Sequence, residues 1–255
     1  MTRTALVTGG AKRIGRAISL RLAAEGYGVI IHYLNSEADA EKTRDDCLAA
    51  GARMARIIRS DLSKQHDRHQ LLDRATEMAG AVNLLVNSAS LFNYDEASTF
   101  VDERLTDHLQ TNYLAPVELT MAMHRMASAS KPDSLSHVVT LLDQKVFNLN
   151  TDYMTYTLAK LASHSSIRYL AQCCAPVMRV NAIAPGLTFV SGEMNQEDFI
   201  NAHRIAALGR SSTAEDIAAS VVLLDESRSI TGQTLVVDGG QHLVPRARDV
   251  AFETR

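Results

Sequence analysis

The chain has 255 residues, 46% of them hydrophobic, and a formal net charge of −3. This length fits one large α/β domain as easily as two small ones, and so balanced a charge argues against a nucleic-acid-binding surface. The sequence starts without an apolar signal-peptide core, and no apolar run approaches the roughly 20 residues of a membrane-spanning helix. We therefore expect a soluble, cytoplasmic protein without a membrane or nucleic-acid partner.

Short apolar runs alternate with longer amphipathic stretches along the chain. The predicted strands cover residues 4–8, 29–31, 55–60, 82–88, 137–142, 177–184 and 234–238. The predicted helices cover residues 13–26, 37–51, 68–80, about 101–127 and 153–172. Several strands are apolar throughout, which is typical of a parallel sheet covered by helices on both faces. The sequence therefore predicts a single doubly wound Rossmann-type α/β domain over residues 1–255, with a seven-stranded, mostly parallel sheet.

Two later segments have no clear period. The interval from Leu187 to about Gly209 is irregular, and we expect it to form a loop-and-helix lid over a site. The tail over residues 244–255 has mixed charge. Packing on a partner subunit and disorder are both open for this tail.

The cysteines and histidines do not indicate a metal site. Cys47, Cys173 and Cys174 lack the spacing of metal ligands, and the nine histidines are scattered. Adjacent cysteines also make poor disulfide geometry. We expect reduced thiols, which suit the cytoplasm, and no bound metal.

A glycine-rich turn follows the first predicted strand and opens the first helix. Gly9, Gly10 and Gly15 lie where an α/β sheet presents backbone N–H groups and a helix N-terminus to a pyrophosphate. Lys12 and Arg13 add positive charge at this turn. The pattern predicts a dinucleotide-binding loop, and a tight turn without a ligand is the alternative.

The end of the second strand indicates which dinucleotide binds. An NAD-specific site carries an acid here, whereas this chain has His32, Asn35 and Ser36 and no acid before Glu37. A carboxylate would repel a 2′-phosphate, whereas hydroxyl, amide and guanidinium groups accept one. We therefore expect NADP(H) as the cofactor; the alternative is that His32 and Tyr33 simply close a strand.

Tyr156 and Lys160 stand four residues apart on the predicted helix 153–172 and so share one face. A free tyrosine has a pKa of about 10 and is a slow acid-base catalyst at neutral pH, but a nearby lysine cation lowers that pKa by roughly 1–3 units. Asp143 lies thirteen residues before the tyrosine. The Tyr156–Lys160 pair predicts proton transfer to a substrate.

These features together resemble the short-chain dehydrogenase/reductase family over residues 4 to about 242. That family has a Thr-Gly-x-x-x-Gly-x-Gly loop, a Tyr-x-x-x-Lys helix and a Pro-Gly segment like "VNAIAPGLT". The resemblance implies a homotetramer, and it implies that Asn112 organises a water relay to Lys160. The implied cofactor site consists of Gly9, Arg13, Ile14, Gly15, His32, Tyr33, Asn35, Ser36, Asp61, Leu62, Asn87, Ser88, Ala89, Tyr156, Lys160, Pro185, Gly186 and Thr188.

Three departures from the family pattern resemble the pteridine reductases, including the dihydromonapterin reductases. Asp143 stands where the family has serine, Arg13 replaces the middle glycine of the loop, and "NSASLF" over residues 87–92 replaces the usual Asn-Asn-Ala-Gly. One position differs, because the pteridine reductases place an arginine where this chain has Asn35. The implied catalytic residues are Asp143, Tyr156, Lys160 and Asn112, and the implied substrate-binding residues are Arg13, Ser90, Phe92, Asp143, Tyr156 and Leu187.

The chemistry of a pterin accounts for these departures. The reduced bond is a ring C=N, so a hydride goes to carbon and a proton goes to nitrogen. An Asp143–Tyr156 pair suits this proton transfer, whereas a serine suits a ketone oxygen. Phe92 can stack on the flat ring. The sequence therefore predicts NADPH-dependent reduction of a dihydropterin, such as dihydromonapterin or dihydrobiopterin, or of dihydrofolate.

Alternatives stay open for the function and for single residues. The first alternative to a pterin reductase is a carbonyl reductase acting on a ketone or a 3-oxoacyl thioester. The second is an NADP(H)-binding regulator without catalysis. The alternative role for Asp143 is to cap a helix or to contact Lys145. The alternative role for Phe92 is ordinary packing in a lid. Tyr153 either lines the pocket or is buried.

Overall fold

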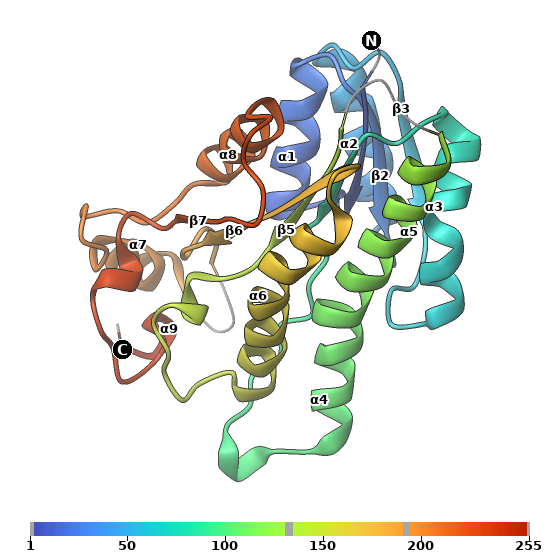
Figure 1. The fold of residues 1–255 in the computed structure, drawn as a ribbon. Helices are drawn as coiled ribbons and strands as arrows, with labels where there is room; N and C mark the ends of the chain where they lie inside the picture. The colour runs from blue at the N-terminus through green and yellow to red at the C-terminus, as the bar shows by residue number, and fades with distance from the viewer. Residues whose placement is uncertain (1–2, 131–134, 191–193, 254–255) are drawn as a thin grey trace.

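The computed structural model describes residues 3–130, 135–190 and 194–253, and Figure 1 shows their fold. One seven-stranded sheet runs through the molecule in the order β3-β2-β1-β4-β5-β6-β7, and each neighbouring pair is parallel. The strands are β1 (Thr4–Thr8), β2 (Gly28–Tyr33), β3 (Ala55–Arg59), β4 (Leu84–Asn87), β5 (Ser136–Leu141), β6 (Met178–Pro185) and β7 (Thr234–Val237). The predicted doubly wound fold is confirmed.

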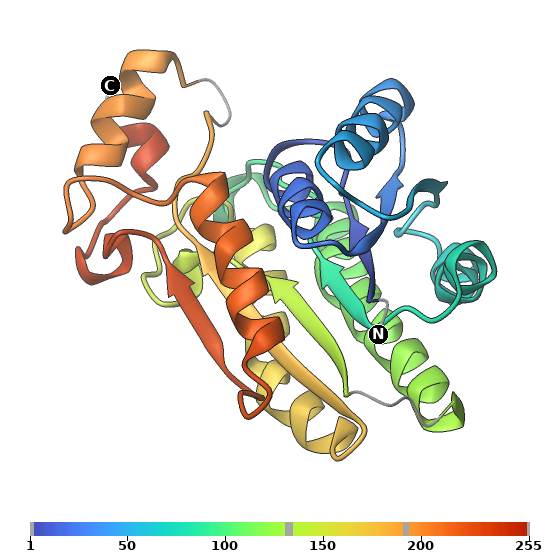
Figure 2. The same cartoon turned by 90° about the horizontal axis from the view of Figure 1, so that it is seen from above.

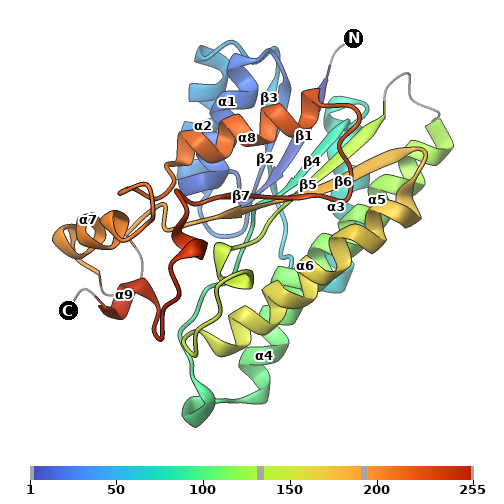
Figure 3. The ribbon, with the colours of Figure 1, turned by 60° about the vertical axis from the view of Figure 1, so that its left-hand side comes forward.

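Helices cover both faces of this sheet, as Figures 2 and 3 show. One face packs on α1 (Arg13–Ala24), α2 (Glu37–Ala49) and α8 (Ala214–Glu226), and the other on α3 (Gln65–Ala79), α5 (Ala115–Ser130) and α6 (Met154–Cys174). Side chains of a strand alternate between the faces, so Leu6 of β1 lies in one core and Val7 in the other. Burial on both sides explains why several of the strands are apolar throughout.

The long helix predicted over residues 101–127 contains one π-helical turn. α4 (Asp102–Leu109) continues through the turn Gln110–Leu114 into α5 without a loop. π-Helical turns inside α-helices are frequent at functional positions. Asn112 lies within this turn.

No helix is predicted between residue 209 and the last strand, and this is wrong because α8 lies within that interval. Its start has a reciprocal capping box. The Thr213 hydroxyl accepts from the Asp216 backbone N–H at 3.2 Å, and the Asp216 carboxylate accepts from the Thr213 N–H at 2.9 Å. A Thr-x-x-Asp pattern before an apolar run was the signal available in the sequence.

The C-terminal residues fold back onto their own chain. After β7, a short helical turn at Gln241–Leu243 leads to α9 (Val250–Glu253), which lies beside α7 (Gln196–Arg204) (Figure 3). An apolar cluster of Met194, Ala202, Val250 and Ala251 joins the two helices. Residues 244–253 therefore pack on their own chain, an arrangement that the sequence analysis did not consider. The interval 187–209, predicted as a lid, contains α7. Residues 191–193 of this interval lie outside the described part of the chain.

None of the helices in the described ranges combines the length and the apolar character that a bilayer crossing requires. Across the same ranges, no three His, Cys, Asp or Glu side chains are grouped closely enough to hold a metal ion.

The strand order reverses between β1 and β4. In doubly wound sheets, ligands bind beyond the carboxyl ends of the strands at this reversal. The turns that follow β1, β4 and β5 therefore meet at the edge where a ligand is expected. These turns carry several of the predicted site residues.

Candidate active site

The turn after β1 packs tightly against the turn after β4. A Cβ on Gly15 would lie 2.2 Å from the Gly9 carbonyl oxygen, and a Cβ on Gly9 would lie 2.9 Å from Ala89 Cα. Both positions therefore require glycine. Because a helix leaves its first N–H groups without intrahelical partners, those of Arg13 and Ile14 are donors that suit an anion at this edge. These residues fit the pyrophosphate of a dinucleotide.

Arg13 stands in a backbone conformation that favours glycine. Its φ is 51°, in the left-handed region, which explains why the family has glycine at this position. The side chain is exposed, and its guanidinium carbon lies 5.2 Å from the ring centroid of Phe189. A strained arginine of this kind often persists because its side chain has a function.

His32 is buried and forms hydrogen bonds that support the glycine turn. Its Nδ1 accepts from the Gly9 N–H at 3.0 Å, and its Nε2 donates to the Ser60 carbonyl at 3.0 Å. Burial lowers the pKa of His32 to about 4, so the ring is neutral at physiological pH. Both nitrogens are used within the protein, and His32 positions the turn instead of offering a cation to a phosphate.

We expect the free energy of unfolding to depend on pH through His32. Its folded pKa of about 4 lies below the ordinary value of 6.5, so the folded state binds fewer protons between these values. The contribution, about 3 kcal/mol, is fully present above pH 6.5 and is lost as the pH falls toward 4.

Urea unfolding at about pH 7.5 and about pH 4.5 measures this loss. The His32→Gln variant should lose less stability than the wild type between the two conditions. The exposed His66→Gln is the matched control, which should keep the wild-type loss. Equal losses in all three proteins would contradict the assignment.

The other residues after β2 surround the end of that strand. Tyr33 is buried, and its hydroxyl donates to Glu37 at 2.8 Å, whereas Asn35 is exposed. The sequence analysis missed Arg59, at the carboxyl end of β3. Its exposed side chain donates from Nε to the Leu34 carbonyl at 3.1 Å, which places a cation beside Asn35. Only the parallel pairing of β2 and β3 brings them together.

Backbone groups after β4 bond to side chains of neighbouring strands. The Thr8 hydroxyl accepts from the N–H groups of Ser88 and Ala89, each at 3.0 Å. Asn87 is buried and donates to the Thr140 hydroxyl at 3.3 Å. These bonds fix the turn at the carboxyl end of β4.

Asn112 clamps the loop that carries the predicted substrate residues. Its amide oxygen accepts from the Leu91 N–H at 2.8 Å and from the Ser90 hydroxyl at 3.2 Å, and its amide nitrogen donates to the Leu91 carbonyl at 2.8 Å. The side chain expected to organise a water relay to Lys160 therefore holds this loop. Phe92 follows directly.

The start of α6 is capped from a distant part of the chain. The buried Asp95 carboxylate accepts from the Thr155 N–H at 3.1 Å. His108 Nδ1 lies 2.7 Å from the Thr155 hydroxyl, and its Nε2 accepts from the Asn93 N–H at 3.3 Å. The loop over residues 91–96 is thereby fixed to the helix that carries Tyr156.

Asp143, Tyr156 and Lys160 meet at the carboxyl end of β5. The Tyr156 hydroxyl donates to Asp143 Oδ2 at 2.8 Å, and Lys160 Nζ donates to the Leu141 carbonyl at 2.7 Å. Asp143 Oδ1 also accepts from the Lys145 N–H at 2.8 Å. Asp143 therefore both caps a turn, as the alternative proposed, and pairs with the tyrosine.

The protonation of this group follows from burial and charge. Burial and the Asp143 carboxylate raise the pKa of Tyr156 well above its ordinary value, although the Ser90 hydroxyl acts in the opposite direction. The prediction that Lys160 lowers this pKa is wrong, because those two effects dominate. Burial raises the pKa of Asp143 and lowers that of Lys160 to about 8. At neutral pH, Tyr156 is thus protonated and Lys160 is a cation.

Aromatic rings lie over Tyr156. The Phe92 ring is 40% exposed and meets the Tyr156 ring edge-on, with centroids 4.7 Å apart. On another side it stacks on Tyr153 at 4.2 Å and 18°. Tyr153 is buried, which decides the alternative left open for it. Phe92 thus presents an exposed, flat surface beside the proton donor.

The segment after β6 is braced by residues that the sequence analysis missed. A Cβ on Gly186 would lie 2.4 Å from the Ser211 hydroxyl, and Gln241 Oε1 accepts from the Leu187 N–H at 2.9 Å. The Thr188 hydroxyl lies 3.0 Å from that of Ser212. These contacts place the Pro185–Thr188 segment at the same sheet edge as the glycine turn. No local sequence pattern points to them.

Two further predicted residues, Asp61 and Leu62, lie after β3. The Asp61 carboxylate accepts from the N–H and the hydroxyl of Ser63, at 3.1 and 2.7 Å. Leu62 is buried in the core beneath α3 and α5.

A comparison with protein-family models identifies the family. Residues 9–242 match the model described as Enoyl-(Acyl carrier protein) reductase. The chain belongs to the short-chain dehydrogenase/reductase family. The prediction of an oxidoreductase of this family is confirmed.

Known members of the short-chain dehydrogenase/reductase family differ in substrate. The crystal structure of FolM Alternative dihydrofolate reductase 1 from Brucella canis, complexed with NADP, is 37% identical and superposes with a TM-score of 0.86, covering 94% of each chain. Pteridine reductase 1 of Leishmania tarentolae is 28% identical, covering 94% of this chain and 96% of the relative. The human 3-oxoacyl-(acyl-carrier-protein) reductase is 30% identical, covering 96% and 100%. The expected NADP(H) cofactor agrees with the cofactor named for the Brucella structure, and the resemblance to pteridine reductases is confirmed.

Proposed function

We propose that this protein reduces a ring C=N bond of a dihydropterin, or of dihydrofolate, with NADPH. The observation that carries the proposal is the 2.8 Å hydrogen bond between Tyr156 and the Asp143 carboxylate, beside the exposed Phe92 ring. A carbonyl reductase of this family would place a serine where Asp143 stands. The likeness to a dihydrofolate reductase and to a pteridine reductase supports the same substrate class.

The chain's own residues divide the work of proton transfer and binding. When bound, NADPH supplies the hydride that goes to the ring carbon. Tyr156 donates its proton to the ring nitrogen, and its own hydrogen bond to Asp143 holds the hydroxyl in place. The tyrosinate left behind is reprotonated from water, and the Asp143 carboxylate again accepts the hydrogen bond of the hydroxyl. Lys160, a cation at neutral pH, binds the nicotinamide ribose.

The glycine turn binds NADPH, and Phe92 binds the flat ring of the substrate. The N–H groups of the glycine turn, including that of Arg13, receive the pyrophosphate, and the Phe92 ring stacks on the pterin so that the pterin lies between Phe92 and nicotinamide. Ser90, held by Asn112, bonds to the polar edge of the ring. Leu187 lines the other side.

Consumption of NADPH by the purified protein tests this function. A dihydropterin is offered beside a 3-oxoacyl ester, and the absorbance of NADPH is followed. Turnover of the pterin alone supports the proposal. Turnover of the ester alone supports the second candidate, a 3-oxoacyl reductase, which the human relative favours. Tight NADPH binding without turnover of either substrate would support a regulator.

Size-exclusion chromatography tests the expected homotetramer.

We expect Arg59 and Arg13 to select NADPH over NADH by binding the 2′-phosphate. Charge-assisted hydrogen bonds contribute about 1.5–3 kcal/mol, so Arg59→Ala or Arg13→Gly should raise the Kd of NADPH about tenfold or more. The Kd of NADH should change little, because NADH lacks that phosphate.

Arg53→Ala is the matched control for this prediction. Arg53 is also exposed, but it lies before the amino end of β3, away from the site. Its substitution should leave both Kd values unchanged. Parallel loss of NADPH and NADH binding in the Arg59 variant would contradict a role in selectivity.

A further inference from the structure

The C-terminal segment 244–253 is fixed to the connection between β5 and α6. Lys145 Nζ donates to Asp249 Oδ2 at 3.0 Å, and only 3% of the Lys145 side chain is exposed. Arg248 Nε bonds to both carboxylate oxygens of the buried Asp152, at 3.0 and 2.9 Å. The Asp249 N–H donates to the same carboxylate at 2.7 Å. Because breaking a buried ion pair leaves an uncompensated charge, these contacts resist detachment of the segment.

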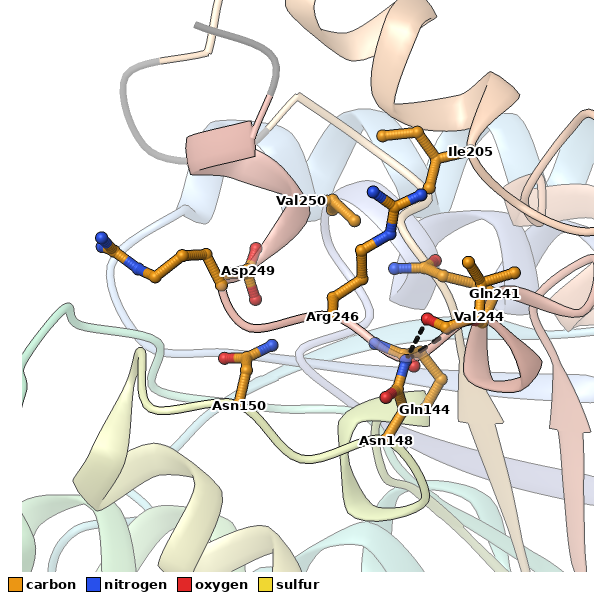
Figure 4. A pocket seen from close by; sticks show the side chains of 10 residues that line it. Gln144, Asn148, Asn150, Ile205, Gln241, Val244, Arg246, Asp249 and Val250 are labelled. Carbon is orange, nitrogen blue, oxygen red and sulfur yellow. Dashed lines mark hydrogen bonds between the residues drawn. The ribbon is translucent and has the colours of Figure 1, made fainter.

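The segment is also packed closely against this connection. Figure 4 shows Gln144, Asn148 and Asn150 facing Gln241, Val244, Arg246 and Asp249. The space between them measures about 10 Å³, enough for one water at most. Asn148 donates to the Val244 carbonyl at 3.0 Å across it.

Phe252, at the end of this segment, joins a row of aromatic rings that reaches the proton donor. Its ring lies 6.1 Å from Tyr153 at 30° and 5.2 Å from Tyr94 at 63°. Tyr153 in turn stacks on Phe92, and Phe92 meets Tyr156. Lys145 Nζ lies 5.3 Å from the Tyr153 ring centroid, so the ion pair with Asp249 and the aromatic row meet at Tyr153.

Tyr153 is the residue through which the segment reaches Phe92. It has a φ of 56°, a left-handed conformation that is costly for a tyrosine, and it stands immediately before α6. Such a conformation persists only where surrounding contacts enforce it. Phe252 and Lys145 supply contacts of this kind from outside the site already described.

We propose that Phe252 is a positioning residue of the substrate site, which holds the Phe92 ring against the substrate by fixing Tyr153. This inference rests on the proposed function in that it takes Phe92 as the surface for a flat substrate. The segment 244–253 is then part of the substrate site of its own chain. In the described part of the chain, the Phe252 ring contacts the rings of Tyr94 and Tyr153 and not that of Tyr156, so we expect it to affect substrate binding and not proton transfer.

Kinetics of the Phe252→Ala variant test the proposal. The KM for the dihydropterin should rise about tenfold, while kcat and the Kd of NADPH stay within about twofold. Phe252→Tyr should restore the KM, because it keeps the ring. Leu243→Ala is the matched control, since Leu243 is an exposed apolar residue next to the segment and outside the aromatic row. A KM unchanged in Phe252→Ala would overturn the proposal.

A double-mutant cycle with Phe92→Ala separates positioning from a merely structural role. If Phe252 acts through Phe92, the double variant should have about the same KM as Phe92→Ala alone. Multiplicative effects of the two substitutions would overturn the inference. If Phe252→Ala fails to fold, Phe252→Leu takes its place in the same cycle.

The failure of this inference can be told from failure of the proposed function. If the wild type reduces the 3-oxoacyl ester and no pterin, the proposed function is wrong, and the cycle is measured with the ester. If it reduces neither, amide hydrogen exchange is measured on the NADPH-bound protein. Faster exchange over residues 90–94 in Phe252→Ala, and not in Leu243→Ala, supports the positioning role. Unchanged exchange there overturns it.

Discussion

Tyr156→Phe is expected to lower kcat for the dihydropterin by about 10²–10⁴-fold, the range typical of a lost general acid. The hydroxyl is the group that donates a proton to the substrate in the proposed reaction, and it is protonated at neutral pH, since burial and Asp143 raise its pKa further above the ordinary value. The substitution leaves the ring and its contact with Phe92 in place. The glycine turn and Lys160 are untouched, so the Kd of NADPH should stay within about twofold.

Tyr169→Phe is the matched control for this experiment. Tyr169 lies on the same helix, α6, but 68% of its surface is exposed. Steady-state turnover measures the loss, and the fluorescence of bound NADPH measures cofactor affinity in a chain that has no tryptophan. Unchanged turnover in Tyr156→Phe would remove the tyrosine from the mechanism. Loss of NADPH binding would instead give it a structural role.

Asp143→Ser is expected to lower pterin reduction about 10²-fold or more, and to lower reduction of a ketone much less. The carboxylate accepts the Tyr156 hydrogen bond and raises the pKa of the tyrosine, so its loss removes the group that orients the hydroxyl. A serine hydroxyl can still donate to a ketone oxygen, which is the role it has in carbonyl reductases of this family. The ratio of kcat/KM for the two substrates is the quantity to measure.

Asp143→Asn separates the charge from the geometry. An asparagine oxygen can still accept from the Lys145 N–H, so the turn after β5 should be retained. The pKa of Tyr156 should fall, because the neighbouring negative charge is gone. Equal losses of pterin and ketone reduction in Asp143→Ser, or a larger loss for the ketone, would contradict the imine argument.

The sequence predicted that Tyr156, Lys160 and Asp143 come together, but not their protonation. Tyr156 and Lys160 lie on one face of a helix because of their spacing, and Asp143 lies just after the strand that precedes that helix. The direction of the tyrosine pKa was wrong, because it depends on burial and on a 2.8 Å contact that spacing does not reveal. The role of His32 was missed for the same reason. Only the fold shows that both its nitrogens are already bonded.

The sequence by itself determined the fold class, the glycine turn and the order of the chemical groups along the chain. These features depend on local patterns: apolar strands, glycines at fixed positions, and two residues spaced i, i+4 on a helix. Only the tertiary structure decided that Asp95 caps α6, that Arg59 lies beside Asn35, and that the tail returns to the site. The Lys145–Asp249 pair joins residues 104 positions apart. Contacts at such separation are selected by packing of the whole domain, and no pattern within a short window encodes them.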